Sequence, residues 1–292
     1  MRTSHPAAGQ PSGSALTAAA ARAAHLIVDG EPRIFADPLA AVLLGDRAEE
    51  LIGYHRRRGT HPVLVGARVQ VTCRSRYAED VLAQAIGGGV SQYVILGAGL
   101  DSFAYRGGLL AGRVRVFEVD HPASQQAKRA ALAAAGIGEP DSVRYVPADL
   151  ARDALGGCLD AAGFDASLPA VVSWLGVTMY LTAEAVAETM TAVARLAPGT
   201  ELIADYLLPE GERDEAGALY GTLVARASAE QGEPWRSYFT PEQMAGLAGR
   251  AGFGAVRAVS QRDTIAAQLW QRADSLHPAR LAMLFHGAVH PG

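Results

Sequence analysis

The feature that most constrains this chain is a glycine turn that directly follows a short apolar run. Residues 93–96, YVIL, predict a buried parallel strand, and Gly97, Ala98 and Gly99 follow it. Because glycine lacks a Cβ, the backbone can bend sharply here and approach a ligand closely. A second apolar run, VFEVD, ends in Asp120 about twenty residues beyond the glycines. In doubly wound sheets a carboxylate at this place binds ribose hydroxyls, so the two features together predict a nucleoside site.

The residues after the glycines favour a nucleoside without phosphate groups. A dinucleotide site needs a third glycine for close helix packing and a free helix N-terminus for the pyrophosphate. Ser102 stands at the third glycine position, and Asp101 places a negative charge where the phosphates would lie. S-adenosylmethionine has no phosphate and carries a cationic amino acid tail, so it fits this turn. Asp101 also suits a helix cap that accepts backbone N–H bonds, and the two roles are compatible.

Composition and charge limit the classes of partner. The 292 residues carry a net charge of −4 and show no basic stripe with interleaved aromatic residues, so we expect no nucleic-acid partner. No apolar run approaches the ~18–20 residues of a membrane-spanning helix, so we expect no membrane partner. Cys73 and Cys158 lack metal-ligand spacing, which predicts no metal site and suits a reducing, cytoplasmic location. The oligomeric state stays open.

The order of the predicted elements indicates an α/β fold preceded by helices. Residues 1–14, with two prolines and two glycines, predict a disordered arm. Residues 15–90 show only helical patterns and are expected to form a helical cap. In residues 91–292 strands and helices alternate, which predicts a parallel sheet with helices on both faces. Charged residues and glycines interrupt this pattern at 209–236, where we expect an insertion.

The predicted sheet contains five apolar strands and two closing strands. The five lie at 93–97, 114–120, 143–149, 170–176 and 201–206. The closing strands are expected to pair as a hairpin at 254–260 and 265–271. Thr240 and Gln243 form a capping box with Pro241 between them, and Gly252 ends the helix that they start.

Four sequence blocks resemble one known family, in the order in which that family carries them. The blocks are ILGAGLDSFAYR, VFEVDHP with Lys128 a little further on, YVPADL and SWLGVTMYLT. They are similar to the leucine carboxyl methyltransferase family in the wide sense, including its bacterial branch that acts on polyketides and other secondary metabolites. The resemblance implies the class I methyltransferase fold, a Rossmann-like sheet of seven mostly parallel strands. It also implies S-adenosylmethionine as cofactor and S-adenosylhomocysteine as product.

The resemblance assigns cofactor contacts along the first three strands. Gly97 and Gly99 would border the methionine part of the cofactor, and Asp120 would hold the ribose. Asp149 would accept a hydrogen bond from the adenine amino group. Leu150 would donate to the adenine through its backbone N–H. These residues, with Asp101, form the expected cofactor site.

The resemblance also implies an arginine ahead of the first strand that binds the carboxylate of the cofactor. Arg74 matches this position best, and Arg76 is the second choice. A planar guanidinium suits the task because it meets a carboxylate with two parallel hydrogen bonds. Alternatively, Arg74 forms a surface or inter-helix ion pair with Glu79 or Asp80.

The expected acceptor is a small molecule rather than a protein. Eukaryotic members of the family carry a glutamate at the end of the fourth strand, where this chain has Leu175. This departure puts a protein-phosphatase substrate in doubt. Tyr180, just beyond the fourth strand, is expected to contact the acceptor, although it also suits the core. Tyr206 and Trp235 are expected to form an aromatic wall around the acceptor.

No residue shows the pattern of a catalytic base, so no catalytic residue is assigned. A carboxylate acceptor is ionised at neutral pH and needs no base, whereas a phenol or alcohol usually does. His121 follows Asp120 and precedes a proline at a helix start, which favours capping or packing over catalysis. This scarcity of bases favours methylation of an oxygen on a carboxylate over methylation of a hydroxyl.

Three other functions stay open from the residues alone. An N- or C-methyltransferase would use the same cofactor. A nicotinamide-dependent oxidoreductase would use a related fold, but Asp101 and Ser102 disfavour its dinucleotide. A binding protein without catalytic activity would keep Arg74, Asp120 and Asp149 in its pocket.

We expect Asp120→Ala to weaken S-adenosylmethionine binding more than tenfold. The substitution removes a charge-assisted pair of hydrogen bonds to the ribose, a loss of roughly 1.5–3 kcal/mol. Calorimetric titration of the wild type and the variant measures both dissociation constants. An unchanged constant would show that other residues hold the ribose.

Overall fold

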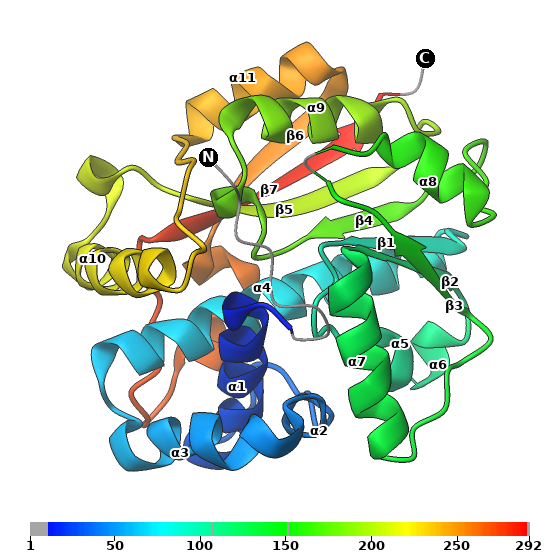
Figure 1. Ribbon diagram of the computed structural model, residues 1–292. Helices are drawn as coiled ribbons and strands as arrows, with labels where there is room; N and C mark the ends of the chain where they lie inside the picture. The colour runs from blue at the N-terminus through cyan, green and yellow to red at the C-terminus, as the bar shows by residue number, and fades with distance from the viewer. Residues whose placement is uncertain (1–10, 107, 151, 291–292) are drawn as a thin grey trace.

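A seven-stranded sheet forms the centre of the protein, with helices on both faces (Figure 1). The computed structural model describes residues 11–290 except residues 107 and 151. The strand order is β3-β2-β1-β4-β5-β7-β6, and β7 runs antiparallel to β5 and β6, whereas the other pairs are parallel. The strands are β1 (Gln92–Leu96), β2 (Arg115–Asp120), β3 (Val143–Pro147), β4 (Val171–Trp174), β5 (Glu201–Leu207), β6 (Phe253–Ser260) and β7 (Ala282–Val289). This topology confirms the predicted mostly parallel α/β sheet.

The described residues ahead of β1 form helices and no strand, as predicted. They form α1 (Gly13–Val28), α2 (Ala40–Leu43), α3 (Ala48–Arg58) and α4 (Pro62–Gly87). Pro62 occupies the first turn of α4, where its fixed φ suits the helix and its missing N–H costs nothing. Residues of the second half of α4 belong to the same apolar cluster as β1 and β2. The boundary between a helical cap and the sheet domain near residue 90 stays a prediction.

Further helices follow the strands. They are α5 (Phe103–Arg106), α6 (Gly108–Ala111), α7 (Pro122–Ala134), α8 (Leu155–Ala161), α9 (Ala183–Ala194), α10 (Glu215–Glu230) and α11 (Pro241–Ala251). The predicted capping box of α11 is confirmed, because Thr240 and Gln243 each accept the other's backbone N–H. Gly252 ends α11 with φ +106°, a left-handed conformation that favours glycine. Helix α10 lies within the segment 209–236 that the sequence analysis marked as an insertion.

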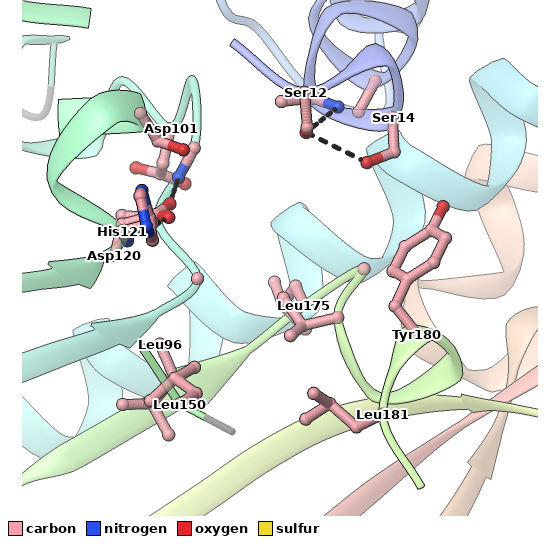
Figure 2. Close-up of a pocket in the computed structure, with 18 of the residues that line it drawn as sticks. Ser12, Ser14, Leu96, Asp101, Asp120, His121, Leu150, Leu175, Tyr180 and Leu181 are labelled. Carbon is pink, nitrogen blue, oxygen red and sulfur yellow. Dashed lines mark hydrogen bonds between the residues drawn. The ribbon is translucent and has the colours of Figure 1, made fainter. Parts of the chain in front are cut away.

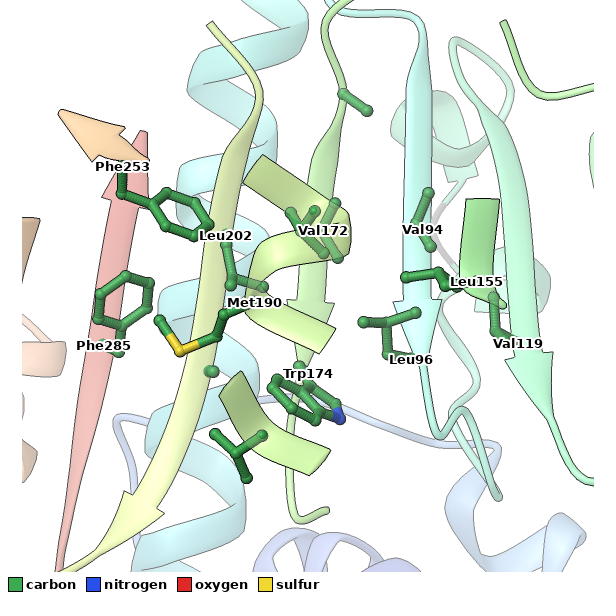
Figure 3. Close-up of a cluster of buried hydrophobic side chains, with 14 of the residues drawn as sticks. Val94, Leu96, Val119, Leu155, Val172, Trp174, Met190, Leu202, Phe253 and Phe285 are labelled. Atoms are coloured by element: carbon green, nitrogen blue, oxygen red, sulfur yellow. The ribbon is translucent and has the colours of Figure 1, made fainter. Parts of the chain in front are cut away.

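Alternate residues of the buried strands pack on opposite faces of the sheet, because successive side chains in a strand point to opposite sides. On one face, Leu96 and Trp174 pack with residues of α8, α9 and α11 (Figure 3). On the other face, Tyr93 and Ile95 pack with residues of α4 and α5. The parallel strands are therefore apolar on both sides, which fits their nearly continuous hydrophobic sequence.

The predicted position of the final strand was wrong. Residues 265–271 do not pair with β6; within them, Ala267–Trp270 form a short 3-10 helix, η5. The strand β7, at Ala282–Val289, fills the place between β5 and β6 instead. A strand in this place has neighbours along both edges and packs against helices on its faces, so it needs the long apolar run AMLFHGAV. A long connection, rather than a tight hairpin, therefore joins β6 to β7.

The start of α1 lies earlier than the expected end of the arm. The helix begins at Gly13, and Ser12 caps it by accepting a hydrogen bond from the backbone N–H of Ala15 at 3.1 Å. Residues 1–10 of the predicted arm lie outside the described residues. Within the described part of the chain, no helix combines the length and the apolarity needed to cross a membrane.

A buried ion pair joins β2 to α7. Lys128 Nζ donates to Glu118 Oε2 at 2.6 Å, and both side chains are 1% exposed. Burial raises the pKa of the Glu118 carboxyl, and the neighbouring Lys128 charge acts against this rise. The ammonium therefore compensates a carboxylate that has no access to water.

We expect Lys128→Met to destabilise the fold by about 3–5 kcal/mol, because it leaves the Glu118 carboxylate buried without its partner. Arg129→Met is the matched control on the same helix, since Arg129 pairs with Glu139 at the surface. Its expected loss is below ~1 kcal/mol. Urea denaturation measures both free energies of unfolding. Equal losses would show that the buried pair contributes no more than the exposed one.

Candidate cofactor and acceptor site

A cavity of about 500 Å³ opens at the carboxyl ends of β1 and β4 (Figure 2). Strand β1 lies between β2 and β4, so the strand order reverses here, and ligands of open α/β sheets bind at this point. The lining residues come from the turns after β1, β2, β3 and β4, from α1 and α4, from the start of α9 and from residues 232–236. Segments from both halves of the chain therefore enclose one cavity.

The turn after β1 takes the conformation that its glycines permit. Gly97 and Gly99 have φ angles of +66° and +48°. The backbone N–H groups of Gly97 and Ala98 donate to the Val119 carbonyl at 2.8 and 3.2 Å, which ties the turn to β2. A Cβ on Gly97 would lie 2.4 Å from Val177 Cγ2. The turn thus leaves no room for a side chain on Gly97.

The Asp120 carboxylate lies at the cavity wall directly beside the glycine turn (Figure 2). Its Oδ2 accepts the backbone N–H of Gly99 at 2.5 Å, and its Oδ1 accepts that of His121 at 2.6 Å. Burial raises the pKa of the Asp120 carboxyl, and these two N–H groups oppose the rise by favouring the ionised form. The carboxylate is therefore oriented by the backbone, and its oxygens retain capacity to accept hydrogen bonds from a ligand.

Asp101 and His121 both cap helices at the cavity. Asp101 Oδ1 accepts the backbone N–H of Phe103 at 2.8 Å, which caps the first turn of α5. Asp101 also lines the cavity, so its carboxylate lies where the predicted ligand role would place it. His121 Nδ1 accepts the backbone N–H of Ala123 at 3.2 Å at the start of α7. This contact agrees with the expectation that His121 caps a helix.

Asp149 and Leu150 follow β3 and line the cavity. The backbone N–H of Asp149 donates to Asp153 Oδ2 at 2.8 Å, which shapes the turn after the strand. Leu150 packs against the apolar cluster that contains Leu96 (Figure 2). The structure thus brings the two residues expected at the adenine to the same cavity as Asp120.

Arg74 reaches the cavity from α4 and pairs with a residue that the sequence analysis did not consider. Its Nη1 donates to Asp205 Oδ2 at 2.8 Å, and its side chain is 14% exposed. The alternative of an ion pair with Glu79 or Asp80 was wrong. Glu79 pairs with Arg106, and Asp80 pairs with Arg76 at the surface.

Tyr180 is the expected acceptor residue that lines the cavity. It ends the 3-10 helix η2 (Thr178–Tyr180), and its hydroxyl points toward Ser14 of α1 (Figure 2). Burial raises the pKa of the Tyr180 phenol. Leu175 also lines the cavity and adds an apolar side chain there.

The structure does not bring Tyr206 and Trp235 to the lining of this cavity. Tyr206 is fully buried in the core and borders a separate cavity of about 270 Å³ between α11, β6 and β7. Trp235 packs with Tyr180 and Met179, while its neighbours Pro234 and Arg236 line the main cavity. Their role at the acceptor stays a prediction.

Several lining residues were missed because they lie in segments interpreted as arm, cap or insertion. Ser14 N donates to Glu233 Oε2 at 3.0 Å, so the start of α1 meets the 232–236 segment across the cavity mouth. Arg22 donates to the Leu100 carbonyl at 2.6 Å and to Asp37 at 2.8 Å. The sequence feature that could have predicted a lining residue here is Arg22, a charged residue within an alanine-rich stretch.

Comparison with known sequences identifies a family and several relatives. A family model described as leucine carboxyl methyltransferase matches residues 15–194, more than half of the chain. A Bacillus subtilis protein, provisionally named an S-adenosyl-L-methionine-dependent methyltransferase, is 34% identical over 172 residues. A Mycolicibacterium smegmatis protein with a similar provisional name is 37% identical over 202 residues. The matches cover 59% and 65% of this chain, and the chain spans only 56% and 64% of these relatives' lengths.

Solved structures share the fold over nearly the whole chain. A crystal structure from Thermobifida fusca, provisionally described as a methyltransferase, aligns with a TM-score of 0.59 at 20% identity, covering 97% of this chain and 96% of that one. A DUF574 family protein from Streptomyces avermitilis aligns with a TM-score of 0.61 at 18% identity, covering 97% and 99%. Together with the strand order, these similarities confirm the class I methyltransferase fold.

We expect Gly97→Ala to destabilise the protein more than Gly163→Ala does. Both glycines have positive φ angles, +66° and +81°, so both variants carry the backbone cost of roughly 1–2 kcal/mol. Only the Cβ at position 97 meets a neighbour, Val177, whereas position 163 is open. The added overlap costs a further ~1–3 kcal/mol. Urea denaturation compares the variants, and equal losses would show that Val177 yields without cost.

Proposed function

Because the chain belongs to the leucine carboxyl methyltransferase family, we propose that it transfers a methyl group from S-adenosylmethionine to an oxygen atom of a small-molecule acceptor. One observation carries this proposal. The glycine turn, Asp120 and Arg74 come from three separate parts of the chain and line the same cavity. That cavity lies at the reversal point of a sheet with the class I methyltransferase strand order.

The lining residues fit the three parts of S-adenosylmethionine. Asp120 accepts hydrogen bonds from the ribose hydroxyls, and Arg74 binds the carboxylate of the amino acid tail. Asp149 accepts from the adenine amino group. Gly97 and Gly99 border the methionine part, because the backbone there has no side chain to exclude it. The cavity volume of about 500 Å³ lies within the range of small-ligand pockets.

The protein contributes positioning to the reaction. When bound, S-adenosylmethionine would supply an electrophilic methyl group: the acceptor oxygen would bond to the methyl carbon in line with the breaking C–S bond, and S-adenosylhomocysteine would leave. Holding both partners in one cavity supplies several kcal/mol of the barrier, up to roughly 7–11 in ideal cases. Burial raises the pKa of the Tyr180 phenol, which disfavours a role as base; since Tyr180 lines the cavity, its hydroxyl would serve as a hydrogen-bond donor to the acceptor.

The acceptor side of the cavity favours a carboxylate on a small secondary metabolite such as a polyketide. Leu175 provides an apolar wall, at a position where the resemblance implies a glutamate in eukaryotic members. Arg236 lines the mouth and adds a positive charge there. His121, the histidine that lines the cavity, is engaged in capping α7, and a carboxylate needs no base. We place this reaction in the cytoplasm, since the free Cys73 and Cys158 suit a reducing compartment.

Two other activities use features of the same cavity. An N- or C-methyltransferase would need the same cofactor contacts and differs only in the acceptor. A nicotinamide-dependent oxidoreductase is disfavoured because Asp101 occupies the N-terminus of α5, where a pyrophosphate would bind.

Calorimetric titration separates these classes of cofactor. We expect binding of S-adenosylmethionine and S-adenosylhomocysteine and no heat with NAD. The expected preference follows from Arg74 and Asp120 together with the anionic Asp101. Tight binding of NAD without a response to either sulfur nucleoside would end the proposal.

Methyl transfer from S-adenosylmethionine labelled in its methyl group identifies the acceptor atom. We expect label to enter a component of a metabolite extract and to be released by mild alkali, because methyl esters hydrolyse there. Methyl groups on phenols, nitrogen or carbon resist this treatment. Label that stays bound in alkali would therefore contradict a carboxylate acceptor.

A further inference from the structure

Asp205 joins two parts of the cavity that lie far apart in the sequence. It is on β5 and is 2% exposed. Its Oδ2 accepts a hydrogen bond from Arg74 Nη1 at 2.8 Å. Its Oδ1 accepts the backbone N–H of Gly176 at 2.5 Å. One buried carboxylate therefore fixes both the arginine from α4 and the turn that follows β4.

The backbone of the same residue holds the acceptor side of the cavity. Thr178 Oγ1 donates to the Asp205 carbonyl at 2.5 Å. Thr178 begins η2, the short helix that carries Tyr180 into the cavity. Ser237 Oγ in turn donates to the Thr178 carbonyl at 2.9 Å, so the segment next to Arg236 is attached to the same helix.

The guanidinium of Arg74 lies in a narrow space that Asp205 and Gly176 define together. A Cβ on Gly176 would lie 2.5 Å from Arg74 Nη2 and 3.0 Å from Arg74 Cζ. The guanidinium therefore rests against bare backbone, while Asp205 holds one of its nitrogens. An arginine has five N–H donors, so the bond to Asp205 leaves others for a ligand. At 14% exposure, Arg74 still reaches the cavity that it lines.

We propose that Asp205 is a positioning residue. It presents Arg74 to the carboxylate of the cofactor, and it holds the turn after β4, from Gly176 to Tyr180, in a fixed position relative to Arg74. This inference rests on the proposed function. A flexible arginine loses about 2 kcal/mol of rotamer freedom when it becomes fixed. The ion pair with Asp205 fixes the Arg74 side chain before the ligand arrives. Ligand binding therefore costs less rotamer entropy at Arg74.

The test compares two ligands that differ in the amino acid tail. S-adenosylhomocysteine carries the tail with its carboxylate, whereas 5′-methylthioadenosine lacks it. In Asp205→Asn, the amide oxygen still accepts a hydrogen bond from either Arg74 or the Gly176 N–H. The amide nitrogen cannot accept, so the other hydrogen bond is lost. We expect calorimetry to show about tenfold weaker binding of S-adenosylhomocysteine and a change below about twofold for 5′-methylthioadenosine.

Two further variants separate positioning from a general structural role. Arg74→Ala should weaken the binding of S-adenosylhomocysteine but not that of 5′-methylthioadenosine. The double variant with Asp205→Asn should bind S-adenosylhomocysteine no more weakly than Arg74→Ala alone. Glu201→Gln is the matched control, because Glu201 lies on the same strand and pairs with His286 at 2.6 Å, away from the cavity. Its two dissociation constants should match those of the wild type. If Asp205→Asn does not fold, Asp205→Ser is measured in its place.

The outcomes distinguish this inference from the proposed function. Selective loss of S-adenosylhomocysteine binding, absent in the Arg74→Ala background, supports a positioning role. Equal weakening of both ligands, or no weakening, overturns it while leaving the methyltransferase proposal intact. A wild-type protein that binds neither ligand overturns both.

Discussion

The rest of the structure depends on a backbone reversal between β1 and α5 that only glycine allows at its tightest point. Gly97 has a positive φ, a Cβ at its position would overlap Val177, and its N–H is bonded to β2. Because the turn presents backbone rather than side chains, the cavity extends to the ends of the central strands. Every other lining element, from α1 to the 232–236 segment, is arranged around this opening.

Backbone N–H groups hold the carboxylates around this opening. Asp120 accepts from Gly99 and His121, Asp101 accepts from Phe103, and Asp205 accepts from Gly176. These hydrogen bonds fix the direction of each carboxylate. The turns that shape the cavity therefore also orient its acidic side chains. The cofactor that we propose carries a cationic tail amine and hydroxyl donors, which match this arrangement.

The fold was predictable where the pattern of apolar residues and the turn-forming residues at its ends indicated the same element. Strands β1 to β5 are apolar runs that end in turns, and the α11 capping box carries its own local signal. The last strand was not predictable in this way, because IAAQLWQ and AMLFHGAV are both apolar enough to form a strand. Pairing on both edges by β5 and β6 selects the second segment. Tyr206 was similarly ambiguous, since a strand residue faces either the cavity or the core.

By itself, the sequence determined the glycine turn, the acidic residue after β2 and the family to which the chain belongs, because these are local patterns along the chain. Only the tertiary structure decided that Arg74 pairs with Asp205, 131 residues away, and that Ser14 meets Glu233 across the mouth. It also decided that Tyr206 faces the core. These contacts depend on how α1, α4 and β5 pack against one another, and no local pattern specifies the partner of a side chain at long range.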